Sequence, residues 1–227
     1  MSSDGLSVAA LVPIKRSSER VPGKNFRALG DVPMYHHLLQ SLRLSRLIDS
    51  VVVDTDSDEL ISSLKTEFPE VIGRRRHDSL GLPDASMDSV LRDAVPNIEA
   101  EVIVQLHVTN PFLRAATIDG AVAAFTAGGS RGTLMSVDRI QSRLWAPDGS
   151  PINHNPRVME RTQDMAPVFK ENSCFYIFRK HEMVTEGVRC IPPISFFPVP
   201  FLEAVDIDTE DDFQVATRLH QSGVLAV

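Results

Sequence analysis

Apolar runs that end in polar turns recur along this chain, and segments with helical spacing follow several of the turns. The first run, residues 8–14, contains no polar side chain, which is typical of a strand buried on both faces of a sheet. Similar runs cover residues 50–54 and 102–108, and helical spacing covers residues 34–47, 59–68 and 117–127. The order strand, turn, helix predicts βαβ units, and therefore a mostly parallel sheet flanked by helices.

The loop after the first strand, residues 15–25, is bent and rich in cations. Pro22 has no N–H to give to a sheet ladder and Gly23 permits backbone angles closed to other residues, so the strand cannot continue. The charged side chains of the loop are Lys15, Arg16, Glu19, Arg20 and Lys24. Open α/β sheets hold ligands at the carboxyl ends of their strands, so this basic loop suits a polyphosphate. A solvated basic turn is the alternative, and no Walker motif G-x-x-x-x-G-K-[ST] occurs.

Two carboxylates near the end of the chain form a candidate metal site. Asp206 and Asp208 stand two apart in an extended segment, so both side chains point to the same side. Thr209 can cap the helix that follows, with Asp212 at its third position, but the cap leaves the earlier aspartates unexplained. Like charges repel unless a cation lies between them, and Mg²⁺ prefers carboxylates completed by substrate phosphates. We predict a Mg²⁺ site here, with an acidic surface loop as the alternative.

A basic loop and a carboxylate pair are the parts that nucleotidyl transfer requires. In that reaction a hydroxyl attacks the α-phosphate of a nucleoside triphosphate and pyrophosphate leaves. The charge on the α-phosphoryl group and on the departing diphosphate must be neutralised. Lys24 is the predicted transition-state cation, and Asp206 and Asp208 are predicted to hold the metal.

Length and charge narrow the class of protein. The 227 residues fit one large α/β domain, residues 1–227, whose pattern loosens at residues 138–170, an excursion expected to be a lid or a dimerisation arm. A net charge of −7 argues against general nucleic-acid binding. No apolar run approaches the ~20 residues that span a membrane and the N-terminus lacks signal-peptide regions, so we expect a cytoplasmic protein without a membrane partner. Cys174 and Cys190 lack metal-type spacing and are expected to be buried free thiols.

Residues 13–25 fit the pattern P-x-[RK]-x-x-S-x-R-x-P-G-K-N. This pattern resembles the signature loop of the sugar-acid cytidylyltransferases, the family of the CMP-N-acylneuraminate and CMP-KDO synthetases. Further blocks are similar to motifs of that family and follow in the same order: residues 53–56, 76–80, 84–86, 106–114, 171–177 and 206–210. The resemblance therefore extends over nearly the whole chain.

The resemblance implies a fold and a reaction. The fold is a Rossmann-like three-layer α/β/α nucleotidyltransferase fold, in which a mostly parallel sheet carries a small dimerisation or lid excursion. The reaction is nucleotidyl transfer from CTP to a sugar acid, an acylneuraminate-type 2-keto-3-deoxy acid, with Mg²⁺ as cofactor and a CMP-sugar and pyrophosphate as products. The resemblance also implies a homodimer, in which the excursion completes the neighbouring sugar pocket.

Residues of this chain that match the motifs of the family are expected to have the roles that the family's residues have. The resemblance places nucleotide contacts at Lys15, Ser18, Arg20, Asn25, Arg76, Ser86 and His107. It places sugar contacts at Thr109 and Asn172 and, in the excursion, at Arg143, Arg157, Arg161 and Gln163, since a guanidinium matches a carboxylate in two parallel hydrogen bonds. It places catalysis at Lys24, Asp206 and Asp208, with both aspartates as metal ligands.

The chain departs from the family pattern at two places. His107 stands where many members have Gln, and Glu19-Arg20 stands where acylneuraminate enzymes often have a basic residue followed by Gly. Two other functions stay open. One is a sugar-1-phosphate nucleotidylyltransferase that uses another nucleotide, although its usual G-x-G-x-R loop is absent here. The other is a non-catalytic nucleotide-binding protein of the same fold.

Overall fold

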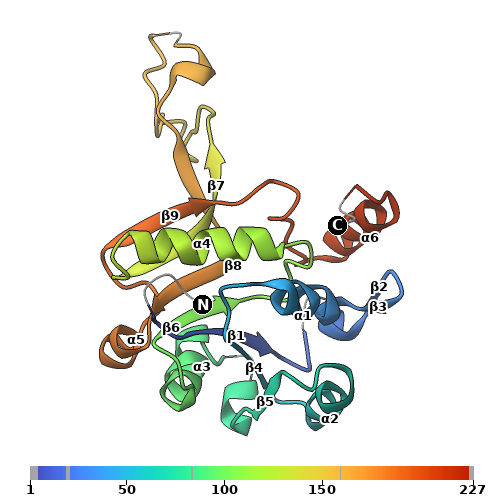
Figure 1. Cartoon of the computed structure of the whole chain (residues 1–227). Helices are drawn as coiled ribbons and strands as arrows, with labels where there is room; N and C mark the ends of the chain where they lie inside the picture. The colour runs from blue at the N-terminus through green and yellow to red at the C-terminus, as the bar shows by residue number, and fades with distance from the viewer. Residues whose placement is uncertain (1–4, 19–20, 83, 159, 225–227) are drawn as a thin grey trace.

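A seven-stranded sheet runs through the middle of the molecule (Figure 1). The computed structural model describes residues 5–18, 21–82, 84–158 and 160–224. The strand order is β5-β4-β1-β6-β8-β7-β9. The strands are β1 (Val8–Ile14), β4 (Ser50–Thr55), β5 (Ile72–Arg75), β6 (Val102–Leu106), β7 (Thr133–Ile140), β8 (Val168–Arg179) and β9 (Ile194–Pro198).

Parallel pairing dominates the sheet. β1 pairs in parallel with both β4 and β6, β4 pairs in parallel with β5, and β7 pairs in parallel with β9. β8 runs antiparallel to its neighbours β6 and β7. A short hairpin, β2 (Ala28–Leu29) with β3 (Val32–Pro33), forms a second small sheet. The predicted mostly parallel sheet is confirmed, with β8 as the reversed strand.

Helices cover both faces of the sheet, which makes three layers (Figure 1). The helices are α1 (Met34–Leu44), α2 (Asp58–Glu67), α3 (Met87–Ala94), α4 (Ala115–Ala127), α5 (Lys180–Glu186) and α6 (Glu210–Gln221). Apolar residues of α1, α2, α4 and α6 join one hydrophobic cluster, and those of α3 and α5 join the other. The predicted α/β/α architecture is therefore confirmed.

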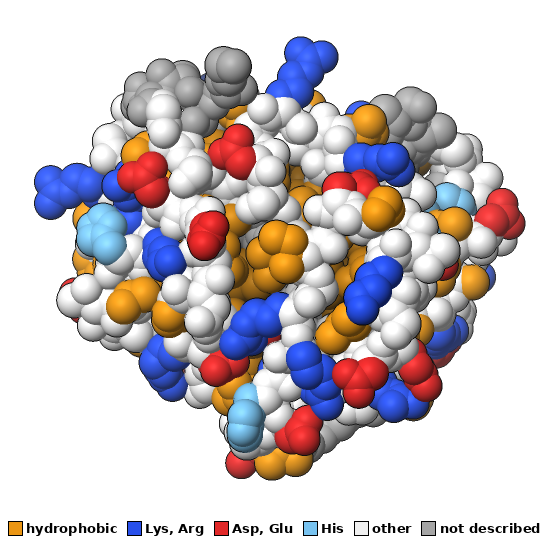
Figure 2. Space-filling view, turned by 60° about the horizontal axis from the view of Figure 1, so that its bottom comes forward, with side chains coloured by type: hydrophobic (Ala, Val, Ile, Leu, Met, Phe, Trp, Pro, Cys, Tyr) orange, Lys and Arg blue, Asp and Glu red, His pale blue; other side chains and the backbone are white. Residues whose placement is uncertain are grey.

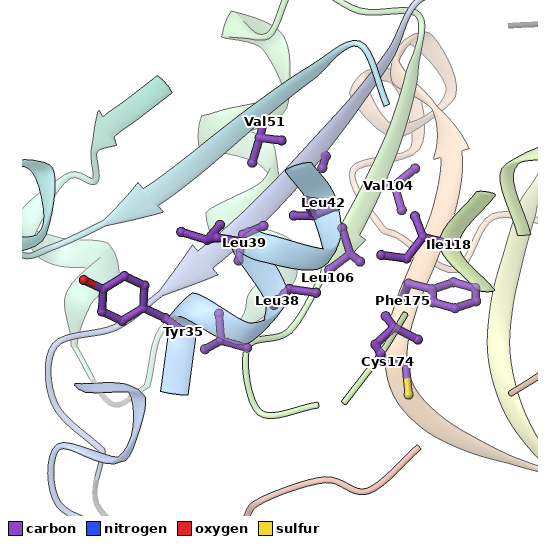
Figure 3. Packing of buried hydrophobic residues seen from close by; sticks show 14 of the residues in the cluster. Tyr35, Leu38, Leu39, Leu42, Val51, Val104, Leu106, Ile118, Cys174 and Phe175 are labelled. Carbon is purple, nitrogen blue, oxygen red and sulfur yellow. The ribbon is translucent and has the colours of Figure 1, made fainter. Parts of the chain in front are cut away.

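The central strands form as the sequence pattern predicts. All seven residues of β1 are buried, because helices lie on both of its faces. In α1 the apolar spacing turns Leu38, Leu39 and Leu42 towards the sheet, where Figure 3 shows them beside Val51 and Leu106. The run that predicted a strand over residues 102–108 ends earlier, at Leu106, so His107 belongs to the loop beyond the sheet.

Residues 138–170 leave the body of the molecule. β7 and β8 continue beyond the sheet as a two-stranded ribbon, and the segment between them projects away from the layers (Figure 1). Within it, Trp145 and Pro151 form an isolated antiparallel bridge. Whether this projection is a lid or a dimerisation arm stays a prediction.

Three further observations concern the charged side chains on the surface, the two cysteines and the length of the helices. On the face in Figure 2, acidic and basic side chains are interspersed rather than gathered by sign. Cys174 is buried but Cys190 is exposed, so the expectation of two buried thiols was wrong for Cys190, which lies in the loop between α5 and β9. Among the described residues, the structure contains no helix long and apolar enough to cross a membrane.

Candidate active site

A polar pocket of about 450 Å³ lies at the carboxyl ends of β1 and β6. Its lining residues are Pro13, Lys15, Ser17, Ser18, Lys24, Asn25, Met87, His107, Val108, Thr109, Ser173, Asp206 and Asp208. They come from five regions that are distant in sequence: the end of β1 with the loop after it, the start of α3, the loop after β6, the strand β8, and the segment before α6. The pocket thus occupies the edge of the sheet where open α/β folds hold their ligands.

Lys24 is the buried cation of this pocket. Gly23 has a left-handed backbone, with φ of 62°, which turns the chain into a 3-10 helix over Lys24–Phe26. The side chain of Lys24 is directed inward, and the residue is 7% exposed. Its Nζ donates to the carbonyl oxygen of Ile207 at 2.5 Å and to Asp208 Oδ1 at 3.1 Å. The basic loop is therefore tied to the segment that carries both predicted metal ligands.

The rest of the loop places further polar groups on the pocket wall. Asn25 Nδ2 donates to the carbonyl oxygen of Lys15 at 2.9 Å, which holds the two ends of the loop together. The amide Oδ1 of Asn25 is buried and accepts no hydrogen bond from the described residues. Lys15, Ser17 and Ser18 also line the pocket. Arg20, another predicted nucleotide contact, lies outside the described residues.

The segment that carries Asp206 and Asp208 is fixed at both ends. On one side, the backbone N–H of Ile207 donates to the carbonyl oxygen of Thr109 at 2.9 Å. On the other, Thr209 and Asp212 form the predicted capping box of α6, and the N–H of Asp208 donates to Asp212 Oδ2 at 3.1 Å. Both carboxylates of the predicted metal site therefore line the pocket from a braced stretch of backbone.

The donor set suits a cation that the substrate helps to bind. Within the described ranges, no group of three His, Cys, Asp or Glu side chains is arranged to hold a metal ion. Mg²⁺ is commonly held by one or two carboxylates plus phosphate oxygens and water, so it does not need a third side chain. Asp206 and Asp208, facing the same pocket as Lys15, fit this kind of site.

His107 lies half-buried at the end of β6 and lines the pocket. Burial, together with the positive charges of Arg189 and Lys24, lowers the pKa of this imidazole to about 4. His107 is therefore neutral at physiological pH. Thr109, a predicted sugar contact two residues further on, shares the same wall.

Neither Arg76 nor Ser86 is among the described residues that line this pocket, and Arg76 lines a separate hollow with Arg74, Arg75 and Asp93. Arg76 is 4% exposed, and its guanidinium donates to Asp54 Oδ2 at 2.6 Å and to the Asp54 carbonyl oxygen at 2.9 Å. Ser86 caps α3 by accepting from the N–H of Ser89 at 3.2 Å, next to the lining residue Met87. Their predicted contacts to a nucleotide remain predictions.

Most predicted sugar contacts lie in the projection between β7 and β8. Arg143 donates to the Glu160 carbonyl oxygen, and Arg161 pairs with Asp164 at 2.6 Å. Arg157 is exposed, and the carbonyl oxygen of Gln163 accepts from Gln141. Asn172, at the base of the projection, is buried and donates to Asp138 Oδ1 at 2.9 Å. None of these residues is among the described residues that line the pocket, although Asn172 is the chain neighbour of the lining residue Ser173.

Ser173 is a pocket residue that the sequence reasoning missed. It lies within β8 with a φ of 58°, a left-handed conformation that is uncommon for a residue other than glycine. The register between β7 and β8 shifts at the same place, between Met135 and Val137. A signal was available, because residues 171–177 resemble a motif of the sugar-acid cytidylyltransferases, N-G-A-x-Y-I, whose Gly stands at the position of Ser173.

Comparisons with known proteins concern the family and the fold of this chain. A family model described as Cytidylyltransferase matches residues 9–225. The chain is 26% identical over 218 residues to N-acylneuraminate cytidylyltransferase A of Danio rerio, covering 93% of this chain and 50% of that protein. It is 23% identical over 226 residues to CMP-N,N'-diacetyllegionaminic acid synthase of Legionella pneumophila, covering 94% and 96%. This chain thus spans about half the length of the fish relative and nearly all of the bacterial one.

The fold also matches a solved structure, a CMP:2-keto-3-deoxy-manno-octonic acid synthetase complexed with CTP. The TM-score is 0.72 at 13% sequence identity, and the match covers 96% of this chain and 100% of the other. At 13% identity this similarity shows that the two proteins share a fold, which includes the sheet whose strand ends form the pocket.

Proposed function

Because this chain belongs to the cytidylyltransferase family, we propose that it transfers the cytidylyl group of CTP to a sugar acid of the 2-keto-3-deoxy type. A hydroxyl oxygen of the acid bonds to the α-phosphorus of CTP. The bond between that phosphorus and the bridging oxygen of the β-phosphate breaks, and pyrophosphate leaves with the electron pair. The hydroxyl proton is released, and the other product is a CMP-sugar. The observation that carries this proposal is the buried Lys24 beside Asp208 in a pocket of polar groups.

The loop after β1 is proposed to bind the triphosphate. Lys15 supplies positive charge at the pocket wall, and Ser17 and Ser18 supply hydroxyl groups. Backbone N–H groups of a bent loop can add further donors to phosphate oxygens. A basic side chain and neutral donors on one loop are suited to a polyanion in a protein that is acidic overall.

Lys24 is proposed to stabilise the transition state. An ammonium group has three donors, and Ile207 and Asp208 take two of them, which leaves one for an oxygen of the α-phosphoryl group. Because these partners already fix the ammonium group, little reorganisation is needed as charge develops. Removal of one such preorganised contact typically lowers turnover by about 10²–10³.

Asp206 and Asp208 are proposed to hold Mg²⁺. The bound cation would neutralise phosphate charge. The two aspartates contribute the fixed part of the site, since Ile207 between them is anchored to Thr109 and the capping box of α6 follows directly.

The acceptor is proposed to bind on the side of Thr109 and Asn172. We further propose that the protein is a cytoplasmic homodimer, with Arg143, Arg157, Arg161 and Gln163 on the projection available to the carboxylate of the sugar acid in the neighbouring subunit. Guanidinium groups suit this task because they donate two parallel hydrogen bonds to a carboxylate.

The test is pyrophosphate release from CTP and Mg²⁺ with a panel of acids: N-acetylneuraminic, legionaminic, pseudaminic and 3-deoxy-manno-octulosonic acid. Release with one acid supports the proposal and identifies the acceptor. Release from UTP or dTTP with a sugar phosphate, but not from CTP, would favour a sugar-1-phosphate nucleotidylyltransferase. CTP binding without release in any combination would favour a non-catalytic nucleotide-binding protein.

A further inference from the structure

A chain of hydrogen bonds leads from a surface loop to the pocket histidine. Gln105 is fully buried in β6, between Arg189 and His107. Arg189 Nη1 donates to Gln105 Oε1 at 3.1 Å. A guanidinium group can only donate and keeps its proton in proteins, so the amide atom that faces it must be the oxygen. Arg189 therefore fixes the orientation of the Gln105 side chain.

The orientation of Gln105 then decides which nitrogen of His107 carries the proton. Gln105 Nε2 lies 2.6 Å from His107 Nε2. Since Gln105 presents an NH₂ donor, His107 Nε2 must be the acceptor and cannot carry a proton. A neutral imidazole keeps one proton, so the proton of His107 is on Nδ1. An imidazolium would place two donors against each other, and the low pKa of His107 agrees with its exclusion.

Arg189 is itself held from three sides. Its guanidinium stacks over the ring of Tyr176, 3.9 Å from the centroid, and the Tyr176 hydroxyl donates to Glu171. Its backbone N–H donates to Asp88 Oδ1 at 3.2 Å, and its carbonyl oxygen accepts from Thr133 Oγ1 at 2.6 Å. The ring contact fixes the guanidinium and the two hydrogen bonds fix the backbone of Arg189. Together these contacts hold the guanidinium in the position from which it donates to Gln105.

We propose that Arg189, acting through Gln105, is a positioning residue that fixes His107 as an Nδ1–H donor for the bound substrate. The group that it recognises is an atom that accepts a hydrogen bond and carries no proton, such as a carboxylate or carbonyl oxygen. Both CTP and a sugar acid contain such atoms, and the experiment distinguishes them. The inference rests on the proposed function for the identity of the substrates, whereas the position of the proton can be measured without them.

The direct test is ¹⁵N NMR of histidine-labelled protein, in which the chemical shifts of the two ring nitrogens identify the tautomer. The signals of His107 are those missing from the His107→Asn variant. We expect the proton on Nδ1 in the wild type and a mixture of tautomers in Arg189→Met. A wild-type His107 with its proton on Nε2, or an unchanged tautomer in folded Arg189→Met, would overturn the proposal.

Two further variants distinguish the positioning role of Arg189 from a general disturbance of the loop that contains it. Arg92→Met removes a guanidinium that binds the same loop, at the Gly187 carbonyl oxygen 2.8 Å away, but the tautomer should stay as in the wild type. Arg189→Lys keeps a cationic donor for Gln105 Oε1 and should keep the Nδ1 proton. If Arg189→Met does not fold, Arg189→Ala takes its place, with Arg189→Lys as the rescue.

The functional arm compares the apparent KM of each substrate. In Arg189→Met we expect the KM of the substrate bound by His107, CTP or the sugar acid, to rise by the factor by which the Nδ1–H tautomer is depleted, about twofold for an even mixture, with no matching change for the other substrate. His107→Leu, which removes the hydrogen bond itself, should raise that KM about tenfold or more. His107→Asn, whose amide N–H lies near the position of Nδ1, should retain more affinity than His107→Leu. Unchanged KM values for both substrates in folded Arg189→Met would contradict the positioning role. A wild type without turnover would contradict the proposed function instead, while leaving the NMR result intact.

Discussion

Lys24 Nζ lies 3.1 Å from Asp208 Oδ1, although the two residues are 184 positions apart in the sequence. This contact joins the loop after β1 to the segment before α6. The side chain of Lys24 is 9% exposed and that of Asp208 is 37% exposed, so the pair is shielded at the cation and open at the carboxylate. The predicted transition-state cation and a predicted metal ligand therefore meet at the pocket with one side open to substrate.

Substitution at this pair should remove activity and leave the fold. We expect Lys24→Met and Asp208→Asn each to lower turnover by about two orders of magnitude or more, because each removes one preorganised electrostatic contact. The measurement is initial-rate pyrophosphate release, with thermal unfolding to verify the fold. Lys65→Ala, on the exposed surface of α2, is the matched control and should keep wild-type turnover. Near-normal turnover in folded Lys24→Met would remove Lys24 from the mechanism.

Arg76→Ala should lower the free energy of unfolding by about 3 kcal/mol, because it removes a partner from a buried carboxylate. Asp54 is 0% exposed and is held by both Arg74 and Arg76. Arg75→Ala, whose ion pairs with Asp58 and Asp78 are on the surface, should cost less than about 1 kcal/mol. Urea denaturation of the two variants provides the comparison. Unchanged stability with weaker CTP binding would point to the nucleotide role predicted from the sequence.

Gly132→Ala should be strongly destabilising. Gly132 has a φ of +64°, and a Cβ atom there would lie 2.1 Å from the carbonyl oxygen of Pro193. We expect a loss of roughly 2 kcal/mol or more, since a strained backbone is combined with a clash against another backbone atom. Gly149→Ala is the matched control, with a φ of +81° and nothing within 4 Å, and should cost about 1 kcal/mol. Equal unfolding midpoints for the two variants would contradict this account.

His107 should make the stability of the protein depend on pH. Burial first, and then Arg189 and Lys24, lower its pKa from 6.5 to about 4 in the folded state. Between these values the unfolded chain binds a proton that the folded chain does not, so this contribution is present above pH 6.5 and is lost as the pH falls towards 4. The stability of the wild type relative to His107→Asn should therefore decrease over this window. Urea unfolding at pH 7.5, 6 and 5 measures it, and a constant difference would show that the pKa is not lowered.

Local patterns of the chain were enough to predict the layers and the chemistry. An uninterrupted apolar run predicts β1 because such a run can be buried on both faces, and all of its residues are buried. The capping box at Thr209 was predicted correctly because it depends on residues three apart. The pocket contains Lys24, Asp206 and Asp208 because each follows or precedes an element that ends at the same edge of the sheet.

Only the tertiary structure determines which charged side chains pair with one another and which line the pocket where a substrate could bind. Arg76 looks like any surface arginine in the run Arg74-Arg75-Arg76, but pairing of β5 with β4 places it against the buried Asp54. The proton of His107 depends on Gln105 in the same strand and on Arg189 from a distant loop. The sequence by itself determined the strands, the caps and the residue types of the site, since these depend on near neighbours. The partners of Arg76, His107 and Lys24 depend on strand order and on the crossing of distant loops, which only the packed chain determines.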